Sequence, residues 1–181
     1  SIEDHFDYSF ELESQLSGTN KEHYLTEIKS LIEQASFTYV RQTKMLGLGH
    51  AILTGQPLVN NEPFAVLLAD DLCDCEDEGV LTQMIRVYKK YKCSIIAIQE
   101  IPMSETNKYG IITGELIDDD TYRVNNMIEK PEIENAPSNL AIIGRYILTP
   151  DIFSILKNIK PDKSQEIQIT DALLVQALKG N

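Results

Sequence analysis

The chain has 181 residues, of which 43% are hydrophobic, and this length is sufficient for one compact domain with a buried core. Its net charge of -12 disfavours general binding to nucleic-acid backbones. No stretch approaches the roughly 20 continuous apolar residues that a membrane-spanning helix needs. Three cysteines without a regular spacing indicate a reducing compartment, so we expect a cytoplasmic protein that binds neither nucleic acid nor membrane.

Helix and strand patterns alternate through the first hundred residues. Asn20 is a plausible N-cap for the first helix, and the continuous apolar run FAVLLA is typical of a strand covered on both faces. This alternation argues for βαβ units and a mainly parallel sheet. The expected helices cover residues 20–35, part of 47–58, and 79–91, and the expected strands cover residues 37–42, 64–69 and 94–99.

The second half begins with three extended segments and ends with two helical ones. The extended segments are YGIITGEL, YRVNNMIEKP and AIIGRYILT, and the helical ones are PDIFSILKNI and EIQITDALLVQAL. We find no internal repeat and no flexible linker. The predicted fold class is therefore α/β, with a mixed, mainly parallel sheet, flanking helices and a single domain over residues 1–181.

Two adjacent aspartates, Asp70 and Asp71, end the apolar run at residues 64–69. In an open parallel sheet, ligands bind beyond the carboxyl ends of the strands, and one or two carboxylates beside a phosphate substrate suit Mg²⁺. The other interpretation is a charged, solvated loop, which also fits the acidic residues that follow, at 74 and 76–78. Cys73 and Cys75 could bind a soft metal, but no second pair of cysteines supports them.

Several short motifs are weak indicators of function when each is taken alone, but their order along the chain is informative. GLGH at residues 47–50 and EKP at residues 129–131 each read alone as turn or surface sequences. Together with the aspartates, they resemble the bacterial UTP–glucose-1-phosphate uridylyltransferases, a family of sugar-nucleotide pyrophosphorylases. The stretches that carry the resemblance are HFDYSFELE, VRQTKMLGLGHAI, FAVLLADD, YGII, IEKPEIENAPSNLAIIGRYILTPDIF and EIQITDAL.

The resemblance implies a Rossmann-like nucleotidyltransferase fold that makes UDP-glucose and pyrophosphate from UTP and glucose 1-phosphate, with Mg²⁺ as cofactor. It implies that Asp70 binds the metal and that Asp71 lies behind it. It also implies that Lys130 contacts the sugar phosphate, while His50 receives no role. The positions that match nucleotide-binding residues are Gln42 and Gly47, and those that match sugar-binding residues are Gly110, Glu129 and Gly144.

The sequence contains no Gly-Thr-Arg, which marks the nucleotide-phosphate loop in the family that it resembles. We therefore expect an internal fragment that lacks the first strand and the C-terminal part of the fold. Such a fragment is expected to be inactive alone and to associate through its incomplete sheet, consistent with a homo-oligomer. Two alternatives stay open: a transferase for another sugar phosphate or for dTTP, and a pyrophosphorylase-like sensor or assembly subunit without catalysis.

Overall fold

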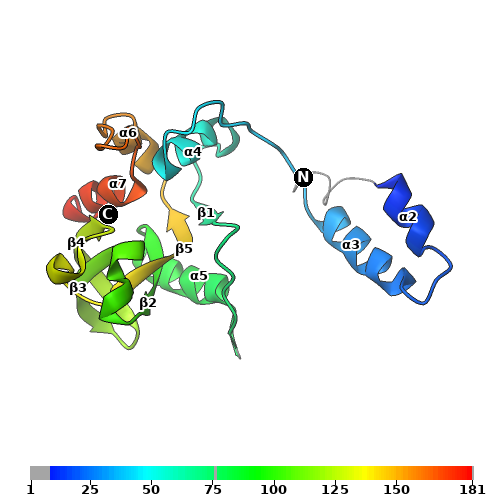
Figure 1. The fold of residues 1–181 in the computed structure, drawn as a ribbon, viewed down its shortest axis with the longest axis horizontal. Helices are drawn as coiled ribbons and strands as arrows, with labels where there is room; N and C mark the ends of the chain where they lie inside the picture. Colours follow the sequence, from blue (N-terminus) through cyan, green and yellow to red (C-terminus); the bar gives the residue numbers. More distant parts are fainter. Residues whose placement is uncertain (1–8, 76, 181) are drawn as a thin grey trace. The chain divides into compact units, whose positions relative to one another are not determined.

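The computed structural model describes residues 9–75 and 77–180 and divides the chain into two compact units (Figure 1). The N-terminal unit spans Ser1–Arg41 and the C-terminal unit spans Gln42–Asn181. The single-domain organisation expected from the sequence stays a prediction. Among the described residues, none of the helices combines the length and the apolar character needed to cross a bilayer.

The described part of the N-terminal unit, residues 9–41, contains the helices α2 (Phe10–Leu16) and α3 (Glu22–Gln34). The helix expected over residues 20–35 is confirmed, but its N-cap is Lys21 and not Asn20. Helix α2, which sequence reasoning missed, begins at Ser9, whose Oγ accepts a hydrogen bond from Leu12 N at 3.4 Å. The predicted strand over residues 37–42 is wrong, because these residues belong to none of the strands in the described ranges.

Over its described residues, 42–75 and 77–180, the C-terminal unit combines a five-stranded sheet with four α-helices and three 3₁₀ turns (Figure 1). The strands are β1 (Phe64–Leu67), β2 (Ile95–Glu100), β3 (Gly110–Asp118), β4 (Thr121–Glu129) and β5 (Leu140–Leu148). The helices are α4 (Leu48–Thr54), α5 (Val80–Tyr91), α6 (Ile152–Leu156) and α7 (Ile169–Leu178), and the 3₁₀ turns are η1 (Gln56–Leu58), η2 (Met103–Lys108) and η3 (Ile133–Asn135). These elements confirm the α/β class and the expected order in this unit.

Strand β5 lies at the centre of the sheet. It pairs with β1 and β3 along one edge and with β2 along the other, because Ile147 and Leu140 each have partners in two strands. All pairings among the described residues are antiparallel, so the prediction of a mainly parallel sheet is wrong for this chain. The alternation of helix and strand correctly indicated that β1 and β2 run in the same direction. It could not reveal that β5 is inserted between them in the opposite direction.

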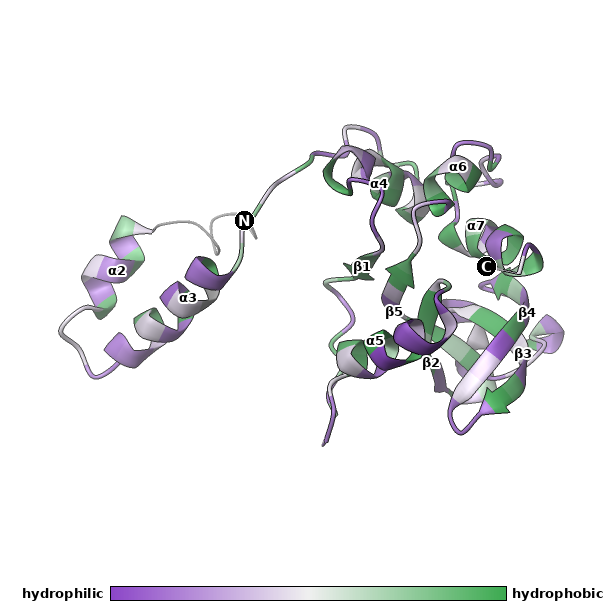
Figure 2. Cartoon of the chain, turned by 180° about the vertical axis from the view of Figure 1, so that it is seen from behind, coloured by the Kyte–Doolittle hydropathy of each residue, from purple (hydrophilic) through white to green (hydrophobic). Residues whose placement is uncertain are grey.

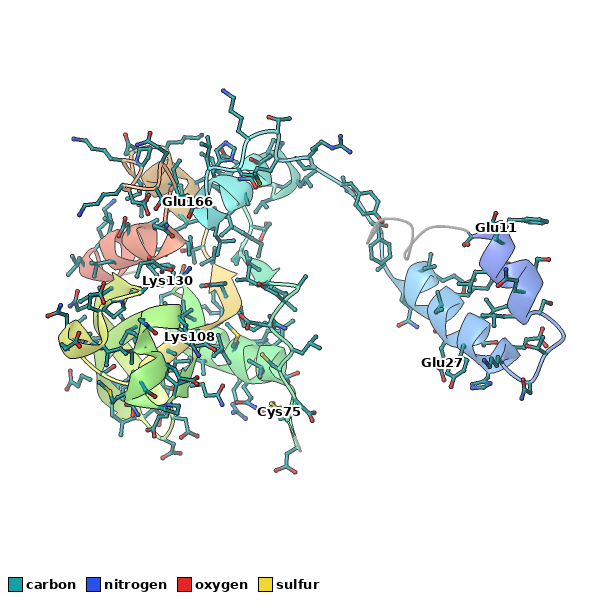
Figure 3. All side chains as sticks on the ribbon, in the orientation of Figure 1. Glu11, Glu27, Cys75, Lys108, Lys130 and Glu166 are labelled. Carbon is teal, nitrogen blue, oxygen red and sulfur yellow. The ribbon has the colours of Figure 1, made fainter. Side chains whose placement is uncertain are left out.

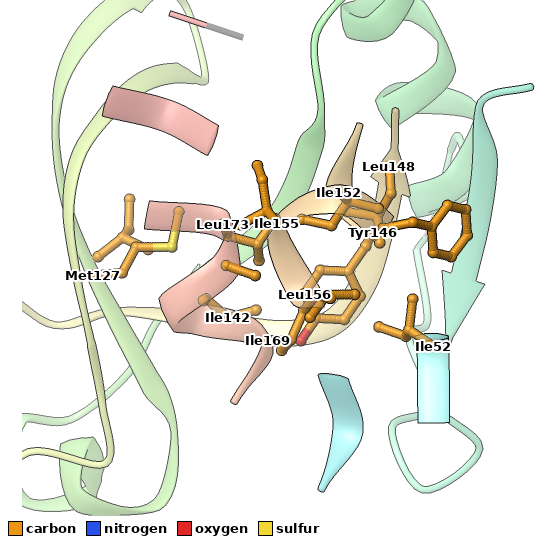
Figure 4. Packing of buried hydrophobic residues seen from close by; sticks show 13 residues of the cluster. Ile52, Met127, Ile142, Tyr146, Leu148, Ile152, Ile155, Leu156, Ile169 and Leu173 are labelled. Atoms are coloured by element: carbon orange, nitrogen blue, oxygen red, sulfur yellow. The ribbon is translucent and has the colours of Figure 1, made fainter. Parts of the chain in front are cut away.

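The two faces of β5 pack against different helices. Ile142, Tyr146 and Leu148 point into the larger core, which α6 and α7 close (Figure 4). Ile147 points the other way, against Met84 of α5 and Ala97 of β2. This alternation follows from the two-residue period of a strand. Figure 2 shows hydrophobic and hydrophilic residues alternating along α5, while β1 is mainly coloured as hydrophobic.

Two features of the central strands depart from the sequence-based expectation. Leu67 of β1 is 53% exposed, so the apolar run at residues 64–69 is covered on only one face. Strand β5 carries a bulge. Ile96 and Ile98 of β2 pair with Tyr146 and Ile142 of β5, so the segment of β5 between these two pairs is longer than the segment of β2. Gly144 lies in this bulge with φ of +62°, a conformation that favours glycine. The bulge faces the site described next.

Candidate active site

A cavity of about 320 Å³ opens in the C-terminal unit, at the ends of β1, β3 and β4. Five residues that sequence reasoning selected line it together, although they come from distant parts of the chain: Asp70, Gly110, Glu129, Lys130 and Gly144. Sequence reasoning missed further lining residues: Lys108, Tyr109, Tyr146, Glu166, Gln168 and Thr170. Figure 3 labels Lys108, Lys130 and Glu166 at this cavity.

One side of the cavity, here named the strand wall, consists of Gly110, Glu129 and Thr170. Gly110 and Glu129 are paired across β3 and β4, and Thr170 Oγ1 donates a hydrogen bond to Glu129 Oε2 at 3.1 Å. A Cβ at position 110 would lie 2.9 Å from Thr170 Cγ2 and 3.1 Å from Glu129 Oε2. Glycine is therefore needed here so that the strand and the start of α7 can approach each other.

Burial raises the pKa of the Glu129 carboxyl above its usual value. The hydrogen bond from Thr170 and the charge of Lys130 act in the opposite direction but do not cancel the effect of burial. Burial also raises the pKa of the neighbouring Tyr146 hydroxyl, helped by the charges of Glu129 and Asp71. Tyr146 therefore stays protonated, so its hydroxyl can donate a hydrogen bond in the cavity, while the half-buried carboxylate of Glu129 can accept hydrogen bonds.

Lys130 follows Glu129 directly and brings a cation to the cavity. Its backbone has φ of +41°, and its N–H donates to Tyr109 O at 3.0 Å, which holds the residue beside η2. Lys108 supplies a second ammonium group and also forms an ion pair with Glu105 at 3.4 Å. Both lysines are exposed, so they can reorient towards an anionic ligand.

Another part of the cavity lining is the aspartate loop, residues Leu68–Asp71, which leaves the end of β1. Asp70 is exposed, and both aspartates line the cavity. Leu68 N donates to Gly144 O at 2.9 Å, so the loop continues alongside the bulge in β5. A Cβ at Gly144 would overlap with Asp71 Oδ2, and this glycine therefore leaves room for the carboxylate.

The two predicted nucleotide-binding residues are brought together but do not line the cavity. Gln42 Nε2 donates to Gly47 O at 3.2 Å and lies 2.9 Å from His50 Nδ1. Gly47 has φ of +85°, and the next residue, Leu48, does line the cavity. The structure thus places Gly47 next to a lining residue and Gln42 against Gly47, with His50 as a partner of Gln42 to which the sequence assigned no role.

The loop over residues 162–168 connects the cavity, which Glu166 and Gln168 line, with the segment that carries Gln42 and Gly47. Asp162 accepts hydrogen bonds from Glu166 N at 3.0 Å and from Gln168 Nε2 at 2.9 Å, and these bonds lower the pKa of its carboxyl. On the other side, Ile167 N donates to Leu46 O at 2.8 Å. A local signal existed in the sequence, because an aspartate before a Ser-containing turn favours such side-chain-to-backbone bonds.

The residues at the cavity fit a hard divalent cation. The lining carboxylates are Asp70, Asp71, Glu129 and Glu166, and the lining cations are Lys108 and Lys130. Within the described ranges, no group of three or more His, Cys, Asp or Glu side chains could hold a metal. Cys73 and Cys75 are exposed thiols, and among the described residues no third metal-binding side chain lies with them to form a zinc site. A cation that takes one or two carboxylates and completes its shell from phosphates and water suits this set.

The chain is similar to known nucleotidyltransferases. The model of the nucleotidyl transferase family matches residues 8–180. A UTP–glucose-1-phosphate uridylyltransferase of Pseudomonas aeruginosa is 61% identical over 99% of this chain, which spans 65% of that protein's length. A crystal structure of a UDP-glucose pyrophosphorylase complexed with UDP-glucose has a TM-score of 0.90 at 56% identity and covers 98% of this chain. A UTP-bound relative from Acinetobacter baumannii has a TM-score of 0.83 at 35% identity. The chain spans 65% of the UDP-glucose complex and 62% of the UTP-bound relative.

Proposed function

This chain belongs to the nucleotidyl transferase family, and we propose that it carries the sugar-phosphate site of a UTP–glucose-1-phosphate uridylyltransferase. The observation that carries the proposal is the assembly of Asp70, Glu129 and Lys130 around one cavity. The names of the relatives and of the UDP-glucose complex support it. The chain spans less than two thirds of those relatives, so the complete activity is proposed for an enzyme of their length.

We assign the glucose moiety to the strand wall. Glu129 accepts hydrogen bonds from sugar hydroxyls, and Gly110 lets the backbone of β3 approach the ring closely. The half-buried carboxylate makes this side selective, because a ligand without the matching hydroxyl would leave it unpaired. Lys130, directly after the end of β4, lines the same cavity, and we propose that it binds the phosphate that the sugar carries.

The reaction needs positioning more than covalent work by the protein. An oxygen of the glucose 1-phosphate attacks the α-phosphorus of UTP, one P–O bond forms, and the bond to the departing pyrophosphate breaks. Lys130 reduces the repulsion between the two anions as they approach. Glu129 and Gly110 fix the sugar, so that the attacking phosphate is held in place against the nucleotide.

Asp70 is the residue that we propose for a divalent cation, with Asp71 behind it. The cation would be Mg²⁺, whose charge offsets the phosphates when it is bound. Gln42 and Gly47 are proposed to contact the uracil ring, and their mutual hydrogen bond supports this shared role. Gln42 has amide and carbonyl groups that complement those of uracil.

We also propose that the enzyme is a cytoplasmic homo-oligomer that binds neither nucleic acid nor membrane. The acidic composition and the three free cysteines support this proposal.

The proposal is tested with a chimaeric protein, the completed enzyme, in which these 181 residues are joined to the flanking segments of the Pseudomonas aeruginosa relative. Pyrophosphate release is measured with glucose 1-phosphate and either UTP or dTTP. We expect release with UTP at a rate at least tenfold above that with dTTP. A Lys130→Met variant should lose most of this activity, whereas the exposed Lys89→Met control should keep it. Preference for dTTP would replace the proposed nucleotide, and an inactive completed enzyme would reject the function.

A further inference from the structure

A buried arginine lies directly behind the aspartate loop. Arg145 of β5 is 9% exposed and follows Gly144 in the bulge. Its guanidinium Nη1 donates to Leu68 O at 2.9 Å and to Gly144 O at 3.0 Å, and its Nη2 donates to Asp71 O. Two of these three carbonyl groups are in the aspartate loop, at its first and last residues.

We propose that Arg145 is a positioning residue that fixes the aspartate loop, and through it the carboxylate of Asp70, at the cavity. Arg145 donates hydrogen bonds to backbone carbonyl groups on both sides of Asp70, and neither bond involves the side chain of Asp70. The Asp70 carboxylate is thereby left exposed and available to a cation. This proposal rests on the proposed function only in the reaction that it assigns to the site, and the positioning of the aspartate loop by Arg145 can be tested without that reaction.

The geometry explains why arginine occupies this position. The guanidinium is a planar group whose donors diverge, so a single side chain can bond carbonyls from two segments at once. A lysine would keep the charge but would present a compact ammonium group on a flexible stem. We therefore expect lysine to hold one part of the loop and to release another. The bulge contributes as well, because its altered register lets β5 turn towards the loop.

Gly144 gives an independent indication of the same design. The backbone of Gly144 accepts the Leu68 N–H at 2.9 Å, while its missing side chain leaves space for Asp71. Adjacent residues of one strand therefore support the loop in two ways, one by hydrogen bonds and one by leaving room. An isolated glycine within the apolar pattern AIIGRYIL is a sequence signal for such a bulge.

Amide hydrogen exchange tests the proposal in the completed enzyme and in its Arg145→Lys variant. We expect the Leu68 amide to exchange about tenfold faster in the variant, since a weakened clamp opens the loop locally. Amides in the β3–β4 pair should exchange at the same rate in both proteins. The matched control is Arg123→Lys, at an exposed arginine of β4 that lies 3.9 Å from Glu115.

Electron paramagnetic resonance of Mn²⁺ gives a second readout that does not depend on turnover. Residues that orient metal ligands typically change the affinity 10- to 100-fold, so we expect Arg145→Lys to weaken Mn²⁺ binding on the order of tenfold. Unchanged exchange at Leu68 in the variant would overturn the proposal. So would faster exchange throughout the sheet or a variant that fails to fold, because either result would assign Arg145 to overall stability. These results stand even if the wild-type completed enzyme makes no UDP-glucose, an outcome that would reject the function alone.

Discussion

The strand wall and the aspartate loop line the same cavity, but they are built in different ways. Glu129 and Gly110 lie opposite each other in an antiparallel strand pair, and Thr170 is a buried residue in the first turn of α7. Asp70 lies in an irregular segment that depends on bonds from β5. A rigid wall suits the recognition of a sugar with fixed hydroxyl directions, whereas an exposed carboxylate on a clamped loop suits a cation that also exchanges water and phosphate ligands.

The largest expected effect comes from removing the charge of the aspartate loop. Asp70→Asn in the completed enzyme should lower kcat by about two to three orders of magnitude, because the phosphates would lose the charge that the cation supplies. Asp119→Asn, at an exposed turn between β3 and β4, is the matched control and should retain activity. An Asp70→Asn enzyme with nearly normal kcat would show that the loop carries no essential cation.

Gly144→Ala should damage the loop through its support. The added Cβ would overlap with Asp71 Oδ2 at a residue whose φ is positive, so we expect thermal unfolding to report a loss of about 2 kcal/mol. Two controls separate the causes. Gly18→Ala shares the positive φ but meets no atom within 4 Å, and Gly79→Ala has neither constraint. A Gly144→Ala protein no less stable than Gly18→Ala would contradict the steric part of this account.

On the strand wall, Glu129→Gln should raise Tm at neutral pH. Because folding raises the pKa of Glu129, the stability that its protonated form contributes is complete below its usual pKa and is lost as pH rises through the raised value. Glutamine removes this charge and keeps an acceptor for Thr170. The difference in Tm should therefore shrink as the pH falls towards 4. The control is Glu134→Gln, at an exposed glutamate in η3, and a gap that widens in acid would contradict the expected sign.

The smallest expected effect concerns the hydroxyl of Thr170. Thr170→Val removes the donor to Glu129 Oε2 while keeping the shape, and we expect affinity for UDP-glucose to fall about fivefold, equivalent to about 1 kcal/mol. Thr170→Ser retains a hydroxyl and should restore most of the affinity. If titration calorimetry gave the same affinity for the valine and serine variants, the hydrogen bond would have no role in holding Glu129.

The sequence predicted the elements of the C-terminal unit better than their pairing. Local periodicity located α5 and α7, because a helix and its apolar face depend on residues a few positions apart. The insertion of β5 between β1 and β2 depends on contacts between residues far apart in the chain, which a single sequence does not display. The strand predicted at residues 37–42 is wrong for a related reason, because β propensity depends on a structural context that the local sequence does not show.

The site shows a similar division. Asp70, Glu129 and Lys130 were found because motif order and family resemblance indicated them, and the structure brings them to one cavity. Arg145 and Thr170 were missed, since their importance depends on partners 74 and 41 residues away. Side chains that position others thus leave little local signal, whereas side chains that face a ligand often lie in short motifs.

The most direct test of the central claim is titration of UDP-glucose into the completed enzyme and its Glu129→Gln variant, followed by calorimetry. The account predicts one binding site per chain and an affinity at least about tenfold weaker in the variant, because a charged acceptor that binds sugar hydroxyls is lost. The Glu134→Gln control should bind like the wild type. Equal affinities of the wild type and the Glu129→Gln variant would contradict the claim that this cavity recognises the sugar.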